Sequence, residues 1–184
     1  GIGDGHDKDE KDQKEWLKYS YSGLKTSLSE DLKEKIKAFL KNEDGRESFG
    51  ALYSEIEKIN HSEPWNDPEH DKNKIWNFVL LDAGTNRGYG NSIFATKRSC
   101  IIGKDQCKTY CVNDNLEIDS KNGSIAFVPP VTKNVFIKYY NTTVNNLLEW
   151  SESDAKYYKK NIFDALKEFD VIDSQTINDG DNNE

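Results

Sequence analysis

The chain has 184 residues, of which 32% are charged and 35% hydrophobic, so it can form one ordered domain and lies outside the disordered class. The net charge of −8 excludes binding to nucleic acid through overall charge and leaves only a local basic patch for such contact. No apolar run approaches the roughly 18 residues of a membrane span, so we expect a cytoplasmic protein without a membrane segment.

The first third of the chain is predicted to be helical. A first helix is expected over about 9–19, and a capping box from Ser27 to Glu30 opens a second one to about Lys41. A third helix is expected to end near Ile59. Apolar residues recur at helical spacing in the second and third helices: Leu28, Leu32, Ile36, Phe39, Leu40, Phe49, Leu52, Tyr53, Ile56 and Ile59. We therefore expect two amphipathic helices packed together.

The middle of the chain mixes loops with short apolar runs. The polar stretch 61–74 predicts a loop, and the apolar run 75–81 is followed by a turn and a short helix over 92–97. The runs 100–102 and 125–128 are predicted to pair as strands. Two prolines at 129 and 130 would end the second strand, because proline cannot donate to a ladder.

The last third is predicted to be helical again, with segments near 134–140 and 144–150. Ser151 to Asp154 cap the clearest helix, whose apolar face is Ala155, Tyr158, Ile162, Phe163, Leu166 and Phe169. We expect one domain over 1–172 and a disordered acidic tail over 173–184. The predicted fold class is α+β, with helices dominating.

Three asparagines, Asn77, Asn86 and Asn91, lie in the central stretch. Taken alone they favour a plain loop, because asparagine is a turn former and three glycines stand among them. Their order is more informative. The stretch contains, in order, an asparagine, a hydrophobic run, a turn, a potential ligand and a basic helix. This order resembles the end of the HNH, or ββα-metal, nuclease motif.

The chain is also similar to the C-terminal HNH domain of GmrSD-type restriction and phage-defence proteins. Three separated blocks carry this resemblance: LLDAGTNRGYGNSIFATKR, PPVTKNVFIKYY and LLEWSESDAKYYKKNI. A helical spacer with QKEWL near its start also fits the family pattern. The resemblance covers most of the chain from Trp16 to Phe169 and implies a mostly helical domain around a small ββα-metal element.

The resemblance implies a metal-dependent DNA endonuclease. Asn77 would orient the catalytic imidazole, Asn86 would bind a divalent ion such as Mg²⁺, and Asn91 would be an alternate ligand. The positive side chains Arg87, Lys97 and Arg98 would meet the DNA backbone by charge. The implied partners are DNA and an upstream ParB-like nucleotide-handling domain of the same protein. The chain starts with glycine and contains no methionine, so we expect a piece excised from a longer protein.

The N-terminal half of the expected site departs from the family pattern. Gly3-Asp-Gly-His6 stands where the family carries a Glu-His-Ile-His-like run. In one alignment His6 falls on the second family histidine and Asp4 replaces the catalytic one; in the other, Asp4 binds metal and His6 acts as general base. The glycines disfavour a rigid strand there. Loss of the first half of the site is favoured over a working variant.

Two alternatives to an active nuclease follow from these residues. One is a catalytically degenerate relative that binds DNA or a partner protein with the same fold. The other is an unrelated interaction domain in which the asparagines only shape a loop. The three cysteines, Cys100, Cys107 and Cys111, lack the spacing of a zinc site and are interpreted as reduced thiols.

Overall fold

The structure is a computed structural model, and it describes residues 9–42, 47–61, 74–81, 92–123, 127–144 and 146–168. Within these ranges the fold is mostly helical, with six α-helices, one 3-10 helix and a small two-stranded antiparallel sheet. The elements in chain order are α1 (Glu10–Leu24), α2 (Glu30–Leu40), α3 (Phe49–Asn60), η1 (Ile75–Asn77), α5 (Phe94–Asp105), β1 (Lys108–Thr109), β2 (Lys121–Asn122), α6 (Pro130–Phe136) and α7 (Glu152–Glu168). None of the helices in these ranges is long and apolar enough to cross a bilayer.

The three N-terminal helices begin at side-chain caps. Asp9 accepts a bond from the Asp12 amide at 2.8 Å, and Ser48 caps α3 in the same way. Ser29 caps α2 by accepting from the Leu32 amide. The prediction that Ser27 opens this helix was therefore wrong by two residues, because the serine nearer to the first helical turn satisfies its amides.

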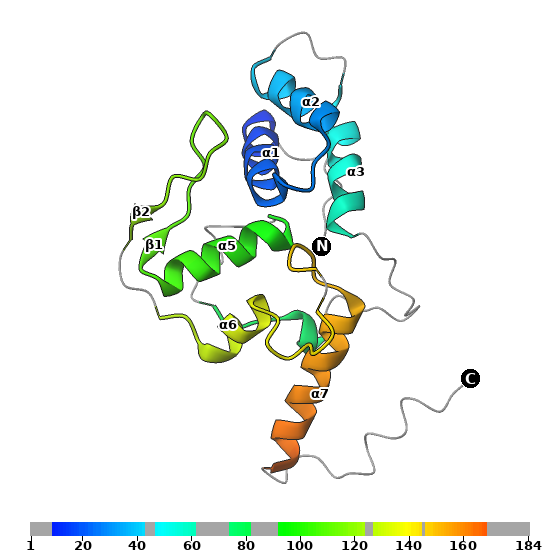
Figure 1. Ribbon diagram of the computed structural model, residues 1–184, viewed down its shortest axis with the longest axis vertical. Coiled ribbons are helices and arrows are strands. Elements are labelled where there is room, and N and C mark those ends of the chain that lie inside the picture. The colour runs from blue at the N-terminus through cyan, green and yellow to red at the C-terminus, as the bar shows by residue number, and fades with distance from the viewer. Residues whose placement is uncertain are drawn as a thin grey trace, which may run out of the picture.

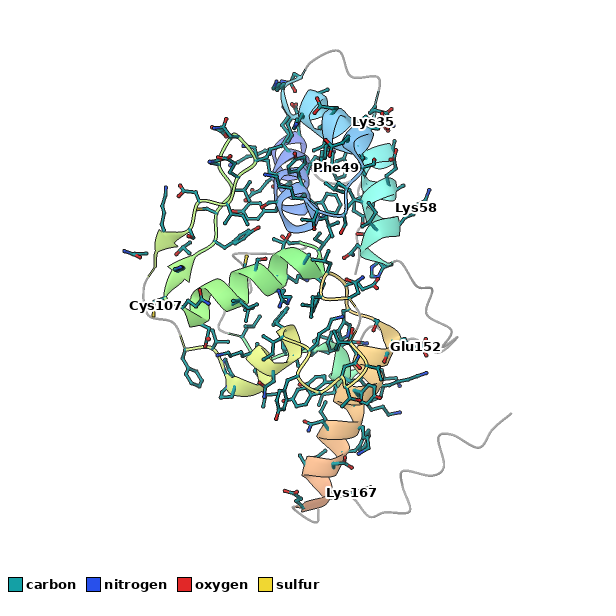
Figure 2. The ribbon with its side chains drawn as sticks, viewed as in Figure 1. Lys35, Phe49, Lys58, Cys107, Glu152 and Lys167 are labelled. Atoms are coloured by element: carbon teal, nitrogen blue, oxygen red, sulfur yellow. The ribbon has the colours of Figure 1, made fainter. Side chains whose placement is uncertain are left out.

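The main hydrophobic cluster joins α1, α2 and α3. Its buried members include Leu17, Leu24, Ile36, Leu52 and Ile56, none of which exposes measurable surface. Figure 2 shows Phe49 directed into this cluster, where its ring meets that of Trp16 edge-on at 5.9 Å between centroids. The predicted packing of two amphipathic helices is confirmed, with α1 as a third partner.

Helix α5 lies between this three-helix layer and the C-terminal elements (Figure 1). Ile93 and Ala95 at its start belong to the main cluster. Helix α1 approaches closely there, because Gly23 has no side chain and the Thr96 hydroxyl donates to the Tyr19 carbonyl at 2.8 Å. A Cβ atom on Gly23 would lie 2.7 Å from Thr96 Oγ1 and 3.1 Å from the Thr96 nitrogen.

Replacing Gly23 by alanine is expected to lower the free energy of unfolding by about 1–3 kcal/mol, because the added methyl group forces the two helices apart. Gly103 in α5 is the matched control. A Cβ atom there would meet only the Lys108 carbonyl, at 3.6 Å, which is ordinary contact. Gly103→Ala should therefore leave stability unchanged or raise it by up to about 1 kcal/mol through helix propensity. Urea denaturation of both variants measures the two free energies of unfolding. Equal values would contradict the close approach of α1 and α5 at Gly23.

A second cluster lies on the other side of α5. Ile101 and Phe136 are its buried members, and partly buried residues pack around them: Val79, Leu81, Phe94, Cys100 and Val128. The rings of Phe94 and Phe136 stack at 5.6 Å between centroids. Helix α6 starts at Pro130, where the missing amide proton costs nothing. The two prolines therefore open a helix, and the prediction that they end a strand was wrong.

The predicted strand pairing was also wrong. Residues 100–102 lie inside α5, Val128 lies in no strand, and residues 125 and 126 fall outside the described ranges. The observed sheet pairs β1 with β2, with Lys108 opposite Asn122 and Thr109 opposite Lys121. The error arose because a short apolar run fits a buried strand and one turn of a buried helix equally well.

A buried polar centre orders the C-terminal part. Lys138 has a positive φ of 57° and sends its Nζ atom to Asp154 Oδ2 at 2.6 Å. The side chains are only 2% and 1% exposed. Asp154 also accepts bonds from Ser151 and Asn141, which confirms the predicted cap of the last helix. The helix predicted over 144–150 was wrong, since its described residues form bends or have no regular secondary structure. Phe169 and the tail 173–184 lie outside the described ranges.

Candidate functional site

The structure describes three of the eight residues predicted for the site: Asn77, Lys97 and Arg98. The other five lie outside the described ranges: Asp4, His6, Asn86, Arg87 and Asn91. The expectation that Asn77 and Asn86 belong to one site is therefore untested. What can be built is the C-terminal half of the expected site, namely the segment around Asn77 and helix α5.

Asn77 is the last residue of η1, and its amide donates to the Lys74 carbonyl at 2.9 Å. Its side chain is half-buried, with the Oδ1 atom shielded from solvent. The chain then becomes extended, with φ −118° and ψ 152° at Phe78. Helix α7 packs on η1 and holds it, with Lys159 Nζ lying 4.8 Å from the centre of the Trp76 ring. Asn77 thus stands at a fixed point where a helical turn passes into extended chain.

The extended residues 78–81 pack against α5. Val79 and Leu81 join the cluster around Ile101, while Phe78 and Leu80 are more than half exposed. This alternation is that of a strand with one buried face. The Thr132 hydroxyl of α6 donates to the Leu80 carbonyl at 2.6 Å and fixes the segment from the other side. The extended segment and the helix that follows it in sequence therefore form one packed unit.

Lys97 and Arg98 lie in the second turn of α5, and both are half-buried. Burial lowers the pKa of Lys97 and, by the same cause, the pKa of Arg98. Arginine starts so high that Arg98 stays charged at neutral pH. Its Nε atom is buried and has no hydrogen-bond partner. Among the described residues no carboxylate forms an ion pair with Arg98.

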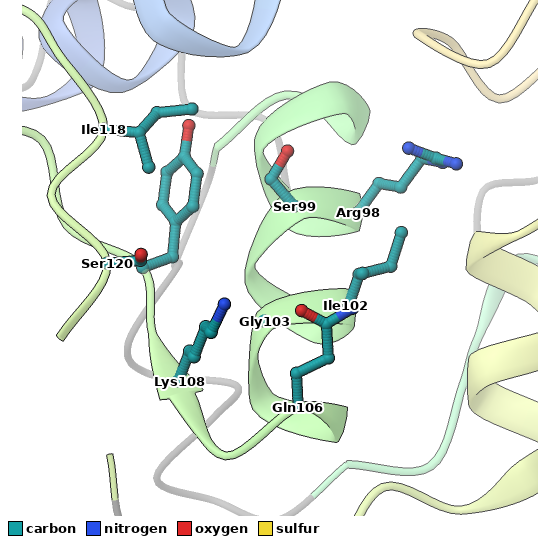
Figure 3. Close-up of a pocket in the computed structure, with 9 residues that line it drawn as sticks. Arg98, Ser99, Ile102, Gly103, Gln106, Lys108, Ile118 and Ser120 are labelled. Atoms are coloured by element: carbon teal, nitrogen blue, oxygen red, sulfur yellow. The ribbon is translucent and has the colours of Figure 1, made fainter. Parts of the chain in front are cut away.

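A hollow of about 290 Å³ opens between α5 and the β1–β2 hairpin. Figure 3 shows Ser99, Ile102 and Gln106 on the α5 wall, and Ile118, Ser120 and Lys108 on the hairpin wall. The described residues that line it are Arg98, Ser99, Ile102, Gly103, Gln106, Lys108, Tyr110, Ile118 and Ser120. They include two cations and several hydrogen-bonding groups, and no carboxylate. We call this space the α5 hollow.

Tyr110 forms part of the inner wall of the α5 hollow. Its hydroxyl lies 2.9 Å from Ser22 Oγ of α1, and burial raises its pKa. The phenol is therefore neutral and held in place. Asn113 closes the hairpin by accepting bonds from the amides of Asn115 and Glu117, both at 2.9 Å. This turn fixes the position of the hairpin wall.

The cysteines take no part in a metal site within the described ranges. All three are free thiols, and burial raises the pKa of Cys100 to about 11. Figure 2 shows Cys107 at the turn between α5 and β1. The described residues contain no group of three or more His, Cys, Asp or Glu side chains that could hold a metal ion. The predicted metal ligands Asp4, Asn86 and Asn91 lie outside these residues.

Comparison with known proteins gives a plain result. No family model, no curated protein and no solved structure matches this chain. The case for function therefore rests on the residues themselves and on how the fold places them.

The fold brings the three sequence blocks together. The described end of the first block starts α5, the second spans α6 and the following turn, and the third includes most of α7. Phe94 joins all three, because its ring stacks on Phe136 and lies 5.8 Å from that of Trp150. The rings of Tyr140 and Tyr158 stack at 5.4 Å and link the second block to the third. Blocks far apart in the sequence thus form one packed unit around α5.

Sequence reasoning missed the hairpin wall of the α5 hollow, and with it Lys108, Tyr110 and Ser120. A usable signal was present. Asn113, Asp114 and Asn115 are turn formers with Val112 and Ile118 on either side, a pattern typical of a hairpin. The residue pair Val112 and Ile118 does form an antiparallel bridge.

Proposed function

We propose that this chain is a metal-dependent DNA endonuclease domain of the HNH type. The observation that supports it best is the packing of the extended segment after Asn77 against α5, with Lys97 and Arg98 in the next turn of that helix. An extended segment and then a helix, with an asparagine before the segment and cations on the helix, is the order that we expect for the C-terminal half of a ββα-metal element. The small sheet β1–β2 follows α5 in the chain and plays no part in this element.

In this proposal each residue has a defined role. Asn77 orients the imidazole of His6, which takes a proton from the attacking water. Arg98 and Lys97, together with Arg87, hold the phosphate backbone by charge and do not identify the sequence. A divalent ion held by oxygens of Asp4, Asn86 and Asn91 would offset the charge that develops on the phosphate and the leaving oxygen.

The test is a plasmid-nicking assay with magnesium, manganese or nickel. Asn77→Ala is expected to lower the nicking rate by about 10–100-fold, the usual cost of losing a group that orients an acid–base or metal-binding side chain. Asn161→Ala is the matched control, because Asn161 is an exposed asparagine on α7. Thermal unfolding of each variant shows whether a lower nicking rate comes from the missing side chain or from an unfolded protein.

Two outcomes contradict the proposal: no nicking by the wild type with any of the three metals, or equal nicking by the Asn77→Ala and Asn161→Ala variants. If the wild type binds DNA without nicking it, the degenerate DNA-binding relative is the better account. The change at Gly3-Asp-Gly-His6 is the observation that favours this second candidate.

A further inference from the structure

The α5 hollow has the size and the walls of a site for one small ligand. Its volume of about 290 Å³ lies at the lower end of small-molecule sites, which begin near roughly 300 Å³. One wall is a helix held by both hydrophobic clusters, and the other is a hairpin held by Tyr110 against α1. The hollow therefore lies between two walls that are held in place, and it is open to solvent on one side.

The charges at the hollow select an anion. Lys108 and Arg98 are the cations, and among the described residues neither forms an ion pair with a carboxylate. Ser120 adds a hydroxyl group that can donate to an oxyanion, whereas the Ser99 hydroxyl already donates to the Ala95 carbonyl at 3.1 Å and the Tyr110 hydroxyl is bonded to Ser22. The described lining holds two cations and no carboxylate, with the Arg98 side chain directed away from Lys108 in Figure 3. A phosphate group fits these donors.

The apolar surface of the hollow favours a ligand that carries an apolar group in addition to a phosphate. Ile102 of α5 and Ile118 of the hairpin both line it, and 54% of the Ile118 surface is exposed (Figure 3). An exposed isoleucine beside a cation offers a flat apolar contact for a sugar or a base. Inorganic phosphate would leave both isoleucines in water and gain nothing from them.

We infer that the α5 hollow binds one nucleotide unit of a nucleic acid strand, with the phosphate at Lys108 and the sugar or base against Ile102 and Ile118. This inference rests on the proposed function for the source of the nucleotide, since it places part of the DNA that the domain would cut. Of the expected site residues that the structure describes, Arg98 lines the hollow, and Asn77 and Lys97 do not.

The experiment measures binding of a fluorescein-labelled oligothymidylate by fluorescence anisotropy in EDTA, where cleavage that needs a metal cannot occur. Lys108→Gln is expected to weaken binding about fivefold and to reduce the slope of log affinity against log salt by roughly 0.7, the value for one contact with a single-strand phosphate. Lys121→Gln is the matched control. It changes the net charge equally, but Lys121 lies on β2, does not line the hollow and pairs with Asp119 at 3.5 Å.

A second variant tests the apolar wall. Ile118→Ser is expected to weaken binding of the oligonucleotide about threefold without changing the salt slope, because it removes apolar contact and no charge. Ile118 is exposed, so the fold should tolerate the change. Thymidine monophosphate should displace the oligonucleotide at a lower concentration than inorganic phosphate does.

Three results overturn the inference: equal affinities of the Lys108→Gln and Lys121→Gln variants, displacement by phosphate as effective as displacement by thymidine monophosphate, or no binding by the wild type. Failure of the proposed function gives a different result. A wild type that binds through Lys108 and never nicks DNA would sink the endonuclease and leave the nucleotide site standing.

Discussion

Replacing Asp154 by alanine is expected to lower the free energy of unfolding by about 3–5 kcal/mol, the largest effect of any single change discussed for this chain. The reason is that Lys138 would keep a buried charge with no counter-charge, since its side chain is only 2% exposed. Asn141 and Ser151 would lose a hydrogen-bond acceptor at the same time. Urea denaturation followed by circular dichroism measures the loss.

Two further variants test whether the effect comes from the burial of the Lys138 charge or from the ion pair alone. Lys138→Met combined with Asp154→Leu removes both charges, so this double variant should be more stable than Asp154→Ala alone. Lys160→Ala breaks an exposed pair with Asp164 on α7 and should change stability by less than about 1 kcal/mol. A loss from Asp154→Ala no larger than that from Lys160→Ala would show that the pair is not buried in solution.

Ile101→Ala is expected to lower the free energy of unfolding by about 2–4 kcal/mol, because it leaves a cavity at the centre of the second hydrophobic cluster. Ile101 exposes no measurable surface and packs near Phe136 and Leu81. Its neighbour Ile102 is the matched control, since it is the same residue in the same helix but lies half-exposed in the wall of the α5 hollow.

Ile102→Ala should cost less than half as much as Ile101→Ala, because part of the removed side chain already lies in water. Thermal or urea unfolding of the two variants gives the comparison. Equal losses would mean that α5 is rotated from the orientation described above.

The sequence predicted long amphipathic elements well. Helices α2, α3 and α7 were expected because their apolar residues recur every three or four positions, and α2 and α7 were also expected from capping residues. Helix α1 was expected from only a few apolar residues. Boundaries were less accurate: the first helix was expected to end at residue 19 and runs to Leu24. The residues from Ser20 to Leu24 are buried against other elements, and such tertiary contact is not visible in local spacing.

Short elements were predicted poorly, for a physical reason. The local pattern of residues 100–102 predicts a strand. They are helical because α5 is held by contacts with α1 and α6, two helices that lie far from it in the sequence. Lys138 could not be singled out, because nothing local shows that a lysine in the left-handed region will bury its amine against Asp154. Such pairs arise only when distant segments are packed.

For the candidate site, the sequence predicted only which residue types follow one another along the chain. It did not predict their positions in space. The sequence placed Asn77 before an extended run and two cations on the next helix, and the structure describes that arrangement. It gave no sign that Lys108 and Arg98 would line one hollow, since the hairpin lies between the two runs, 100–102 and 125–128, that were predicted to pair as strands. Asp4, His6, Asn86, Arg87 and Asn91 stay predictions.

Helix α5 belongs to both hydrophobic clusters, with Ile93 and Ala95 at its start in one and Ile101 in the other. Neither cluster can open without disturbing it, so the described parts of the chain should exchange their slowest amide protons as a single cooperative unit. A ligand held on α5 would then protect amides in α1 and α3 as strongly as those beside it. Affinity measured at the hollow and stability measured in the distant helices become two readouts of the same equilibrium.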